Sequence, residues 1–114
     1  MIRIYHNPRC STSRKALEAV QATGRPVEVI EYLRALPPRD ELRELIRAAG
    51  LTVREALRAK ESAYETLGLA DPSLTDEQLL DAVERHPVLL NRPFVVTDKG
   101  ARLCRPFETI REIL

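Results

Sequence analysis

The chain has 114 residues, with 18 Lys and Arg against 17 Asp and Glu and a formal net charge of +1. This length fits one compact domain, and the near-neutral charge argues against a nucleic-acid-binding protein, which as a rule carries a basic face. No apolar run approaches the roughly 18 residues of a membrane span. The chain has only two cysteines and two histidines, which argues against a secreted disulfide scaffold and against a structural zinc site. We expect a cytoplasmic monomer without bound metal.

The first third of the chain has the pattern of a β-α-β unit. Alternating apolar residues predict a short strand over residues 2–6 rather than a signal peptide. After a turn signal, residues 11–23 have the apolar spacing of a helix, which Gly24 would end. Residues 27–33 predict a second strand. Such a unit favours a parallel strand pair joined by a right-handed crossover.

The middle of the chain, roughly residues 38–87, has helical patterns only and is expected to form an insertion. One apolar stripe predicts a helix over residues 38–49, which Gly50 would end. Residues 52–55 and 75–78 each have the form of a capping box, in which a threonine side chain and an acidic or amide side chain three positions later satisfy backbone N–H groups. Both boxes therefore predict the start of a further helix, and the first of these is a short helix through Arg58.

The last part of the chain returns to strand patterns. Residues 94–97 and 101–104 flank a turn that contains Gly100, which is typical of a β-hairpin. Pro106 would then begin a closing helix. The order β-α-β, helices, β-β-α predicts an α/β fold with a mixed sheet, built as one domain over residues 1–114.

Cys10 is the residue with the most informative surroundings. It stands where the loop after the first strand enters the predicted helix, so it meets the positive end of the helix dipole and unpaired backbone N–H groups. These groups, together with Arg9 and Arg14, favour a thiolate and lower its pKa, and His6 would add charge if protonated. The same N–H groups could bind an oxyanion. A lone cysteine is more often a buried apolar side chain, but its polar and cationic neighbours favour a reactive thiol.

Sequence spacing bears on two rival roles for the cysteines. Cysteine-dependent phosphatases also bind a tetrahedral oxyanion, but they need an arginine six positions after the cysteine, in a C-x5-R loop. In this chain Ala16 occupies the position of that arginine. Cys104 is the obvious candidate for a second, resolving thiol. Its place in a predicted strand favours a buried structural cysteine instead.

Several separated motifs resemble one family. They are Ile4-Tyr5-His6-Asn7-Pro8 leading to Cys10-x-Thr12-Ser13-Arg14, then Arg54-x-x-x-Arg58, the segment from His86 to Pro93, and Arg102-Leu103-Cys104-Arg105-Pro106. In this order, and over essentially the whole chain, they resemble the glutaredoxin-linked arsenate reductases. The resemblance implies a thioredoxin-like mixed sheet with a helical insertion and a cis peptide bond between Arg92 and Pro93.

The resemblance also implies a role for each matched residue. Cys10 would be the nucleophile, and His6 would help to hold it as a thiolate. Ser13 and Arg14 would support the loop that receives the anion. The arginines that would hold arsenate and the arsenic intermediates are Arg58, Arg92 and Arg105.

The implied reaction uses thiols rather than a bound cofactor. The thiolate would attack arsenate, glutathione would serve as co-substrate, and glutaredoxin would complete the reduction to arsenite. Ser11 departs from the Gly of the best-known reductases, which leaves a related oxyanion or another thiol-exchange task open. The remaining alternative is a non-enzymatic thiol regulator. Ser13 removes the C-x-x-C pair on which one such switch of the superfamily depends.

Overall fold

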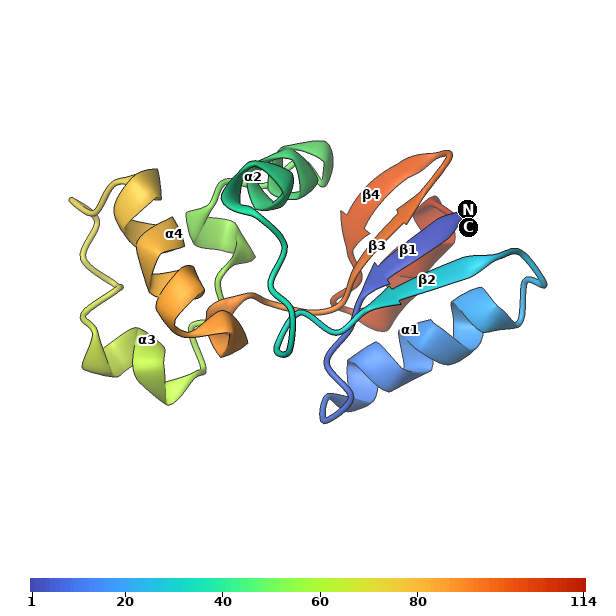
Figure 1. The fold of residues 1–114 in the computed structure, drawn as a ribbon, viewed down its shortest axis with the longest axis horizontal. Coiled ribbons are helices and arrows are strands. Elements are labelled where there is room, and N and C mark those ends of the chain that lie inside the picture. The colour runs from blue at the N-terminus through green and yellow to red at the C-terminus, as the bar shows by residue number, and fades with distance from the viewer.

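The computed structural model describes residues 1–114 and contains a four-stranded sheet of order β2-β1-β3-β4. The strands are β1 (Ile2–Tyr5), β2 (Val27–Ile30), β3 (Phe94–Thr97) and β4 (Gly100–Leu103). β1 and β2 run parallel, whereas β3 pairs antiparallel with both β1 and β4. The sheet is therefore mixed, as the predicted order of elements indicates. Both chain termini lie together at one end of it (Figure 1).

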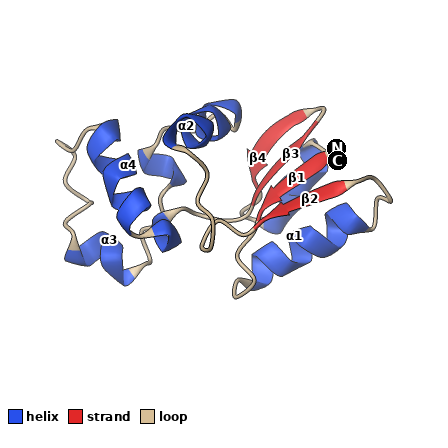
Figure 2. Ribbon diagram, viewed as in Figure 1, coloured by secondary structure: helices blue, strands red, loops and turns tan.

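Helices occupy two places around this sheet (Figure 2). They are α1 (Ser11–Gln21), α2 (Arg39–Ala48), α3 (Ser62–Thr66) and α4 (Asp76–Arg85), with the 3₁₀ segments η1 (Arg54–Ala56), η2 (Pro87–Leu89) and η3 (Phe107–Glu112). α1 connects β1 to β2 and packs beside the sheet, whereas α2, α3 and α4 gather at one end of the molecule as an insertion between β2 and β3 (Figure 1). None of the helices has both the length and the apolar character needed to cross a membrane.

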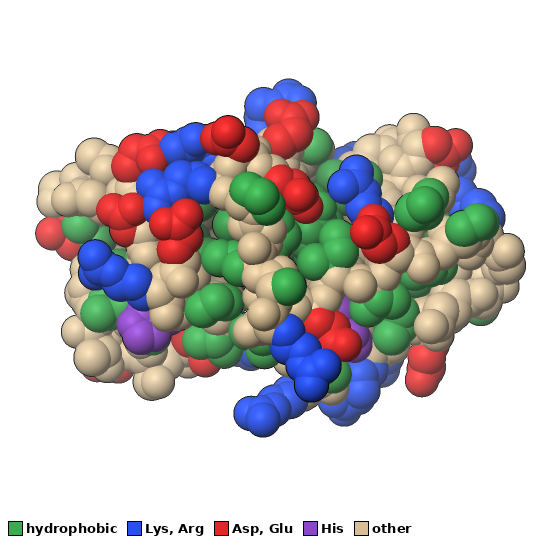
Figure 3. Space-filling view, viewed as in Figure 1, with side chains coloured by type: hydrophobic (Ala, Val, Ile, Leu, Met, Phe, Trp, Pro, Cys, Tyr) green, Lys and Arg blue, Asp and Glu red, His purple; other side chains and the backbone are tan.

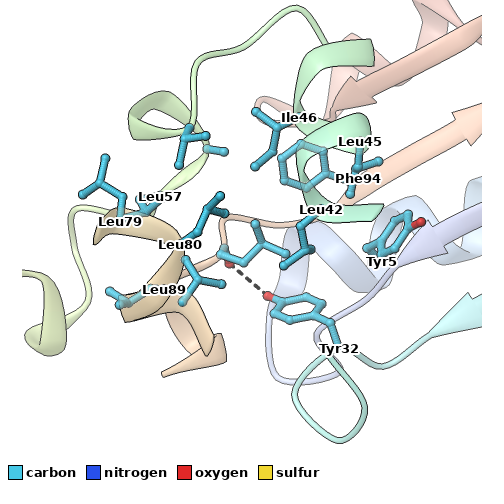
Figure 4. Close-up of a cluster of buried hydrophobic side chains, with 14 of the residues drawn as sticks. Tyr5, Tyr32, Leu42, Leu45, Ile46, Leu57, Leu79, Leu80, Leu89 and Phe94 are labelled. Carbon is cyan, nitrogen blue, oxygen red and sulfur yellow. Dashed lines mark hydrogen bonds between the residues drawn. The ribbon is translucent and has the colours of Figure 1, made fainter. Parts of the chain in front are cut away.

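Two hydrophobic clusters hold these elements together, one on each face of the sheet. Ile2 and Ile4 of β1 meet Val20 of α1 and Ile110 of η3 in the smaller cluster. Because side chains alternate along a strand, Tyr5 joins the larger cluster on the opposite face, where the insertion packs. Members of the larger cluster include Tyr5, Tyr32, Leu42, Leu45, Leu80, Leu89 and Phe94 (Figure 4).

The predicted elements are confirmed in kind and order, and they differ mainly at their ends. The second strand ends at Ile30, not at residue 33, because the chain turns there and the Arg34 N–H donates to the Glu31 carbonyl at 3.0 Å. The closing helix is a 3₁₀ segment, and it buries Ile110 as part of the smaller cluster.

Both predicted capping boxes are present. The Thr75 side chain accepts from the backbone N–H of Gln78, whose own side chain accepts from the backbone of Thr75, and α4 follows. The box at residues 52–55 has the same reciprocal bonds but begins only η1. This helix is short because Leu57, directly after it, is extended and pairs with Leu90.

Candidate active site

The loop between β1 and α1 presents Cys10 at the start of a helix. Cys10 is the N-cap residue of α1 and has extended backbone angles (φ −93°, ψ 122°). Asn7 shapes the loop: its carbonyl accepts from the Cys10 N–H at 3.0 Å, and its Oδ1 accepts from the Arg9 N–H at 2.9 Å. These bonds are local, as is typical of an asparagine in a turn. The turn leaves the Cys10 side chain half-buried.

Two buried polar side chains support this loop through a mutual hydrogen bond. His6 Nδ1 lies 2.6 Å from Ser13 Oγ, and this oxygen also accepts from the Asn7 N–H at 3.0 Å. Burial lowers the pKa of His6, and Arg14 acts in the same direction, whereas Glu31 opposes them. The lowered pKa favours the neutral imidazole, and His6 supports the loop through its contact with Ser13.

The thiol of Cys10 has a lowered pKa, which is the balance of opposing effects. Partial burial raises the pKa, because it disfavours the charged form. The Ser13 N–H and the guanidinium groups of Arg105 and Arg92 lower the pKa and prevail. Arg105 Nη1 is 3.4 Å from the Cys10 sulfur. The pKa is therefore shifted in the direction that the sequence predicts, which favours the thiolate.

Arg105 and Arg92 reach this thiol from the two ends of the β3–β4 hairpin. The Nη1 of Arg105 that contacts the sulfur also donates to the Arg92 carbonyl at 3.2 Å. Arg92 is only 8% exposed, and it donates from Nη1 to the Val88 carbonyl and from Nη2 to Glu61 Oε1, both at 3.0 Å. Its Nε is buried without a hydrogen-bond partner. An unpaired buried donor is costly, and a bound anion would satisfy it.

Arg58 comes from the insertion, which a short antiparallel contact ties to the segment before β3. Leu57 and Leu90 form an isolated β-bridge there. The bridge places Arg58 and Arg92 beside one carboxylate, because Arg58 Nε lies 3.4 Å from Glu61 Oε1, the atom that Arg92 also contacts. Arg105 contacts the thiol directly, and Arg58 is linked to this group through Glu61 and Arg92.

The predicted site residues fall into a central group and a supporting group. The central group consists of Cys10, Arg58, Arg92 and Arg105. Ser13 lies buried under the loop. Arg14 is exposed, and its Nη1 donates to the Pro8 carbonyl at 2.9 Å, so Arg14 braces the loop from outside. The cis bond between Arg92 and Pro93 that the resemblance implies is present.

Glu61 is a residue of this site that the sequence analysis missed. It forms ion pairs with two of the three arginines through a single oxygen atom, and the pair with Arg92 is also a hydrogen bond. A signal existed, because an acidic residue three positions after an arginine is the spacing of an ion pair on a helical turn. That spacing is common on solvated surfaces, so the sequence alone could not single out this pair.

A cavity of about 440 Å³ opens beside the Cys10 loop. It is lined by Asn7, Pro8, Arg9, Glu31, Leu33 and Arg34. Figure 3 shows Lys and Arg side chains gathered along the lower edge of the molecule, in the region where Figure 1 places the β1–α1 loop. Arg9 and Arg34 are both exposed, so this cavity has two cationic side chains and one carboxylate, that of Glu31, in its lining.

Cys104 lies in a different environment. It is completely buried in the cluster between the sheet and α1. Burial raises its pKa to about 12, with a smaller contribution from Glu112. A thiol with this pKa is protonated and unreactive at neutral pH, which agrees with the interpretation of Cys104 as a structural residue.

The fold and the site together define a class of protein. A β-α-β unit that presents a cysteine at a helix N-terminus, followed by an antiparallel hairpin, is a thioredoxin-like arrangement. The arginines place guanidinium groups beside the thiol, where an activated thiolate and a bound oxyanion could meet.

Comparison with known proteins identifies the family within this class. The model of the ArsC family matches residues 5–113. "Arsenate reductase" of Rhizobium meliloti (strain 1021) is 53% identical over 99% of this chain and 81% of that protein, and "Arsenate reductase" of Escherichia coli (strain K12) is 50% identical over 99% and 80%. The solved structure of an arsenate reductase from Vibrio cholerae is 43% identical, with a TM-score of 0.92 over 99% of this chain and 97% of that one. The chain belongs to the ArsC family.

Proposed function

We propose that the chain is an arsenate reductase in which Cys10 is the nucleophile. The observation that carries this proposal is the 3.4 Å contact between the Cys10 sulfur and Arg105 Nη1, at a helix N-terminus and beside Arg92. Relatives named arsenate reductase, 53% and 50% identical over almost the whole chain, support arsenate as the substrate.

The arginines meet an electrostatic need of this reaction. Arsenate is an anion at neutral pH, so its approach to a thiolate brings like charges together. At about 4 Å and an effective dielectric constant of 20, each pair of unit charges repels by about 4 kcal/mol. The guanidinium groups of Arg58, Arg92 and Arg105 offset this repulsion, and their planar N–H groups suit an oxyanion. The unpaired Nε of Arg92 is one donor for it.

The proposed reaction begins with nucleophilic attack. The Cys10 sulfur bonds to arsenic, one arsenic–oxygen bond breaks, and the oxygen leaves as water after taking protons from solvent. The thiol of glutathione then displaces a second oxygen as water. A glutaredoxin thiolate attacks the glutathione sulfur and forms a mixed disulfide, and the electron pair of the broken sulfur–arsenic bond reduces arsenic from +5 to +3. Hydrolysis of the last sulfur–arsenic bond releases arsenite and the Cys10 thiol.

The cavity beside the loop is the proposed place for glutathione. Glutathione carries two carboxylates and one ammonium group, and the cavity lining offers Arg9 and Arg34 with Glu31 between them in sequence, a complementary set of charges. The exposed side of this cavity would also let glutaredoxin approach. Because these donors are reduced thiols, we propose that the protein works in the cytoplasm. We also propose that it works as a monomer, since one chain supplies all of the site residues.

Arsenite production by the purified protein tests the function, with glutathione and glutaredoxin each present or omitted. We expect turnover only when both thiol donors are present. Cys10→Ser should abolish it, whereas Cys104→Ser should retain most of it, since Cys104 lies buried in the core. An equal loss from both substitutions would contradict the role of Cys10. Partner binding without any turnover would favour a regulatory protein instead.

A further inference from the structure

Glu61 occupies a place that the reaction would need for its substrate. One oxygen of its carboxylate, Oε1, lies 3.0 Å from Arg92 Nη2 and 3.4 Å from Arg58 Nε. It is the only carboxylate that pairs with any of the three site arginines. An oxyanion held by Arg58 and Arg92 would use the same donors.

The side chain of Glu61 is also free to leave this place without disturbing the fold. Glu61 is the N-cap residue of α3, yet its carboxylate makes no capping hydrogen bond to the helix. α3 itself has no buried residue, and the Glu61 side chain is 22% exposed. Its displacement toward solvent therefore breaks the two arginine contacts and no other hydrogen bond or ion pair of this side chain.

The charges around the thiol fit such an exchange. Arg58, Arg92 and Arg105 carry three positive charges, which the Glu61 carboxylate and the Cys10 thiolate reduce to an excess of one. With the carboxylate displaced, the excess is two positive charges, which equals the charge of a tetrahedral dianion. A monovalent anion would leave a net charge on partly buried groups, which is unfavourable.

We propose that Glu61 is an internal competitor for the oxyanion site, holding Arg58 and Arg92 until a tetrahedral dianion displaces it. This inference rests on the proposed function, since it takes the arginines as the oxyanion site. Glu61 lowers the affinity of the arginines for every anion. A dianion loses the least affinity, because its two charges restore neutrality with the arginines. Glu61 is thus a specificity-determining residue that keeps the abundant monovalent anions from binding to Arg58 and Arg92.

Protection of Cys10 from alkylation by iodoacetamide tests the proposal without any need for turnover. Sulfate serves as the probe, because it is a tetrahedral dianion that a thiol does not reduce, and ionic strength is held constant to exclude screening. In Glu61→Gln we expect half-protection at a sulfate concentration about tenfold lower than in the wild type, because an opposite-charge partner within about 4–6 Å shifts such equilibria by a factor of 10 or more. Chloride should gain in affinity by a larger factor than sulfate, so that discrimination between the two anions falls.

Glu65→Gln is the matched control, because Glu65 lies exposed in the same short helix and should leave protection unchanged. Glu61→Ala is measured alongside, and thermal melts confirm that both variants are folded. If Glu61 only fixes the arginines in place, its substitution will weaken sulfate protection, and that result, or no change, overturns the proposal. Absence of arsenite production with the expected protection pattern would overturn the proposed function but not this exchange.

Discussion

The two cysteines show how the surroundings of a thiol decide its chemistry. Burial raises the pKa of both. At Cys104 this effect dominates, and the thiol stays protonated. At Cys10 the Ser13 N–H and two guanidinium groups outweigh burial, and the helix dipole acts in the same direction. The same residue type therefore serves as a core side chain in one place and as a candidate nucleophile in the other.

These opposite shifts predict different pH profiles for alkylation of the folded protein. The thiolate is the reactive form, so a lowered pKa moves the rise in rate to lower pH. We expect the rate at Cys10 to inflect below the value of about 8.5 for a free thiol. Cys104, with a pKa of about 12, should remain unmodified up to about pH 9. Mass spectrometry after timed quenching resolves the two sites. If Cys10 in the folded protein inflects no lower than in the urea-unfolded chain, its activation is refuted.

At the scale of elements, local patterns in the sequence were sufficient. Alternation predicted β1, apolar spacing predicted α1 and α2, and both capping boxes were correctly placed. Each of these signals depends on residues within a few positions of one another. Errors arose where a residue far away in the sequence determines the local structure. Leu57, for example, is extended rather than helical because it pairs with Leu90.

The assembly of the site could not be predicted from such patterns. Arg105 and Cys10 are 95 positions apart, and Arg92 and Glu61 are 31 apart. In the sequence, Arg58 looks no different from Arg39, whose side chain pairs with acidic residues of α4 on the surface. Only the resemblance to a family selected the site arginines, and it did not include Glu61.

The capping box of α4 permits a test of one such local signal. Thr75→Ala removes the acceptor for the Gln78 N–H, and we expect it to lower the unfolding free energy by about 1 kcal/mol. Urea unfolding measures this loss, and Thr66→Ala, a substitution of an exposed threonine in α3, is the control. The alkylation rate of Cys10 should not change, because α4 contributes no residue to the site. A change in that rate would mean that α4 controls the position of the arginines.

On the scale of the whole molecule, the site lies where the sheet and the insertion meet. Cys10 and Arg105 belong to the sheet part, whereas Arg58 and Glu61 belong to the insertion. The larger hydrophobic cluster joins these two parts: Leu42 lies between the side chains of the sheet and those of α4 (Figure 4). The Tyr32 hydroxyl also donates to the Leu90 carbonyl across this boundary at 3.1 Å. The relative placement of the site residues therefore depends on this cluster.

Two matched core substitutions separate this dependence from a general loss of stability. Leu42 is fully buried in the larger cluster, and Ile110 is 2% exposed in the smaller one. Their replacement by Ala removes similar apolar volumes, so each should lower the unfolding free energy by about 2–5 kcal/mol. Only Leu42→Ala loosens the insertion that carries Arg58 and Glu61. We therefore expect the KM for arsenate to rise several-fold in Leu42→Ala and to stay near the wild-type value in Ile110→Ala, both measured well below the melting temperatures. Equal KM values at equal loss of stability would show that the sheet and the insertion hold the site as one rigid unit, because the larger cluster would then have no special influence on the arginines.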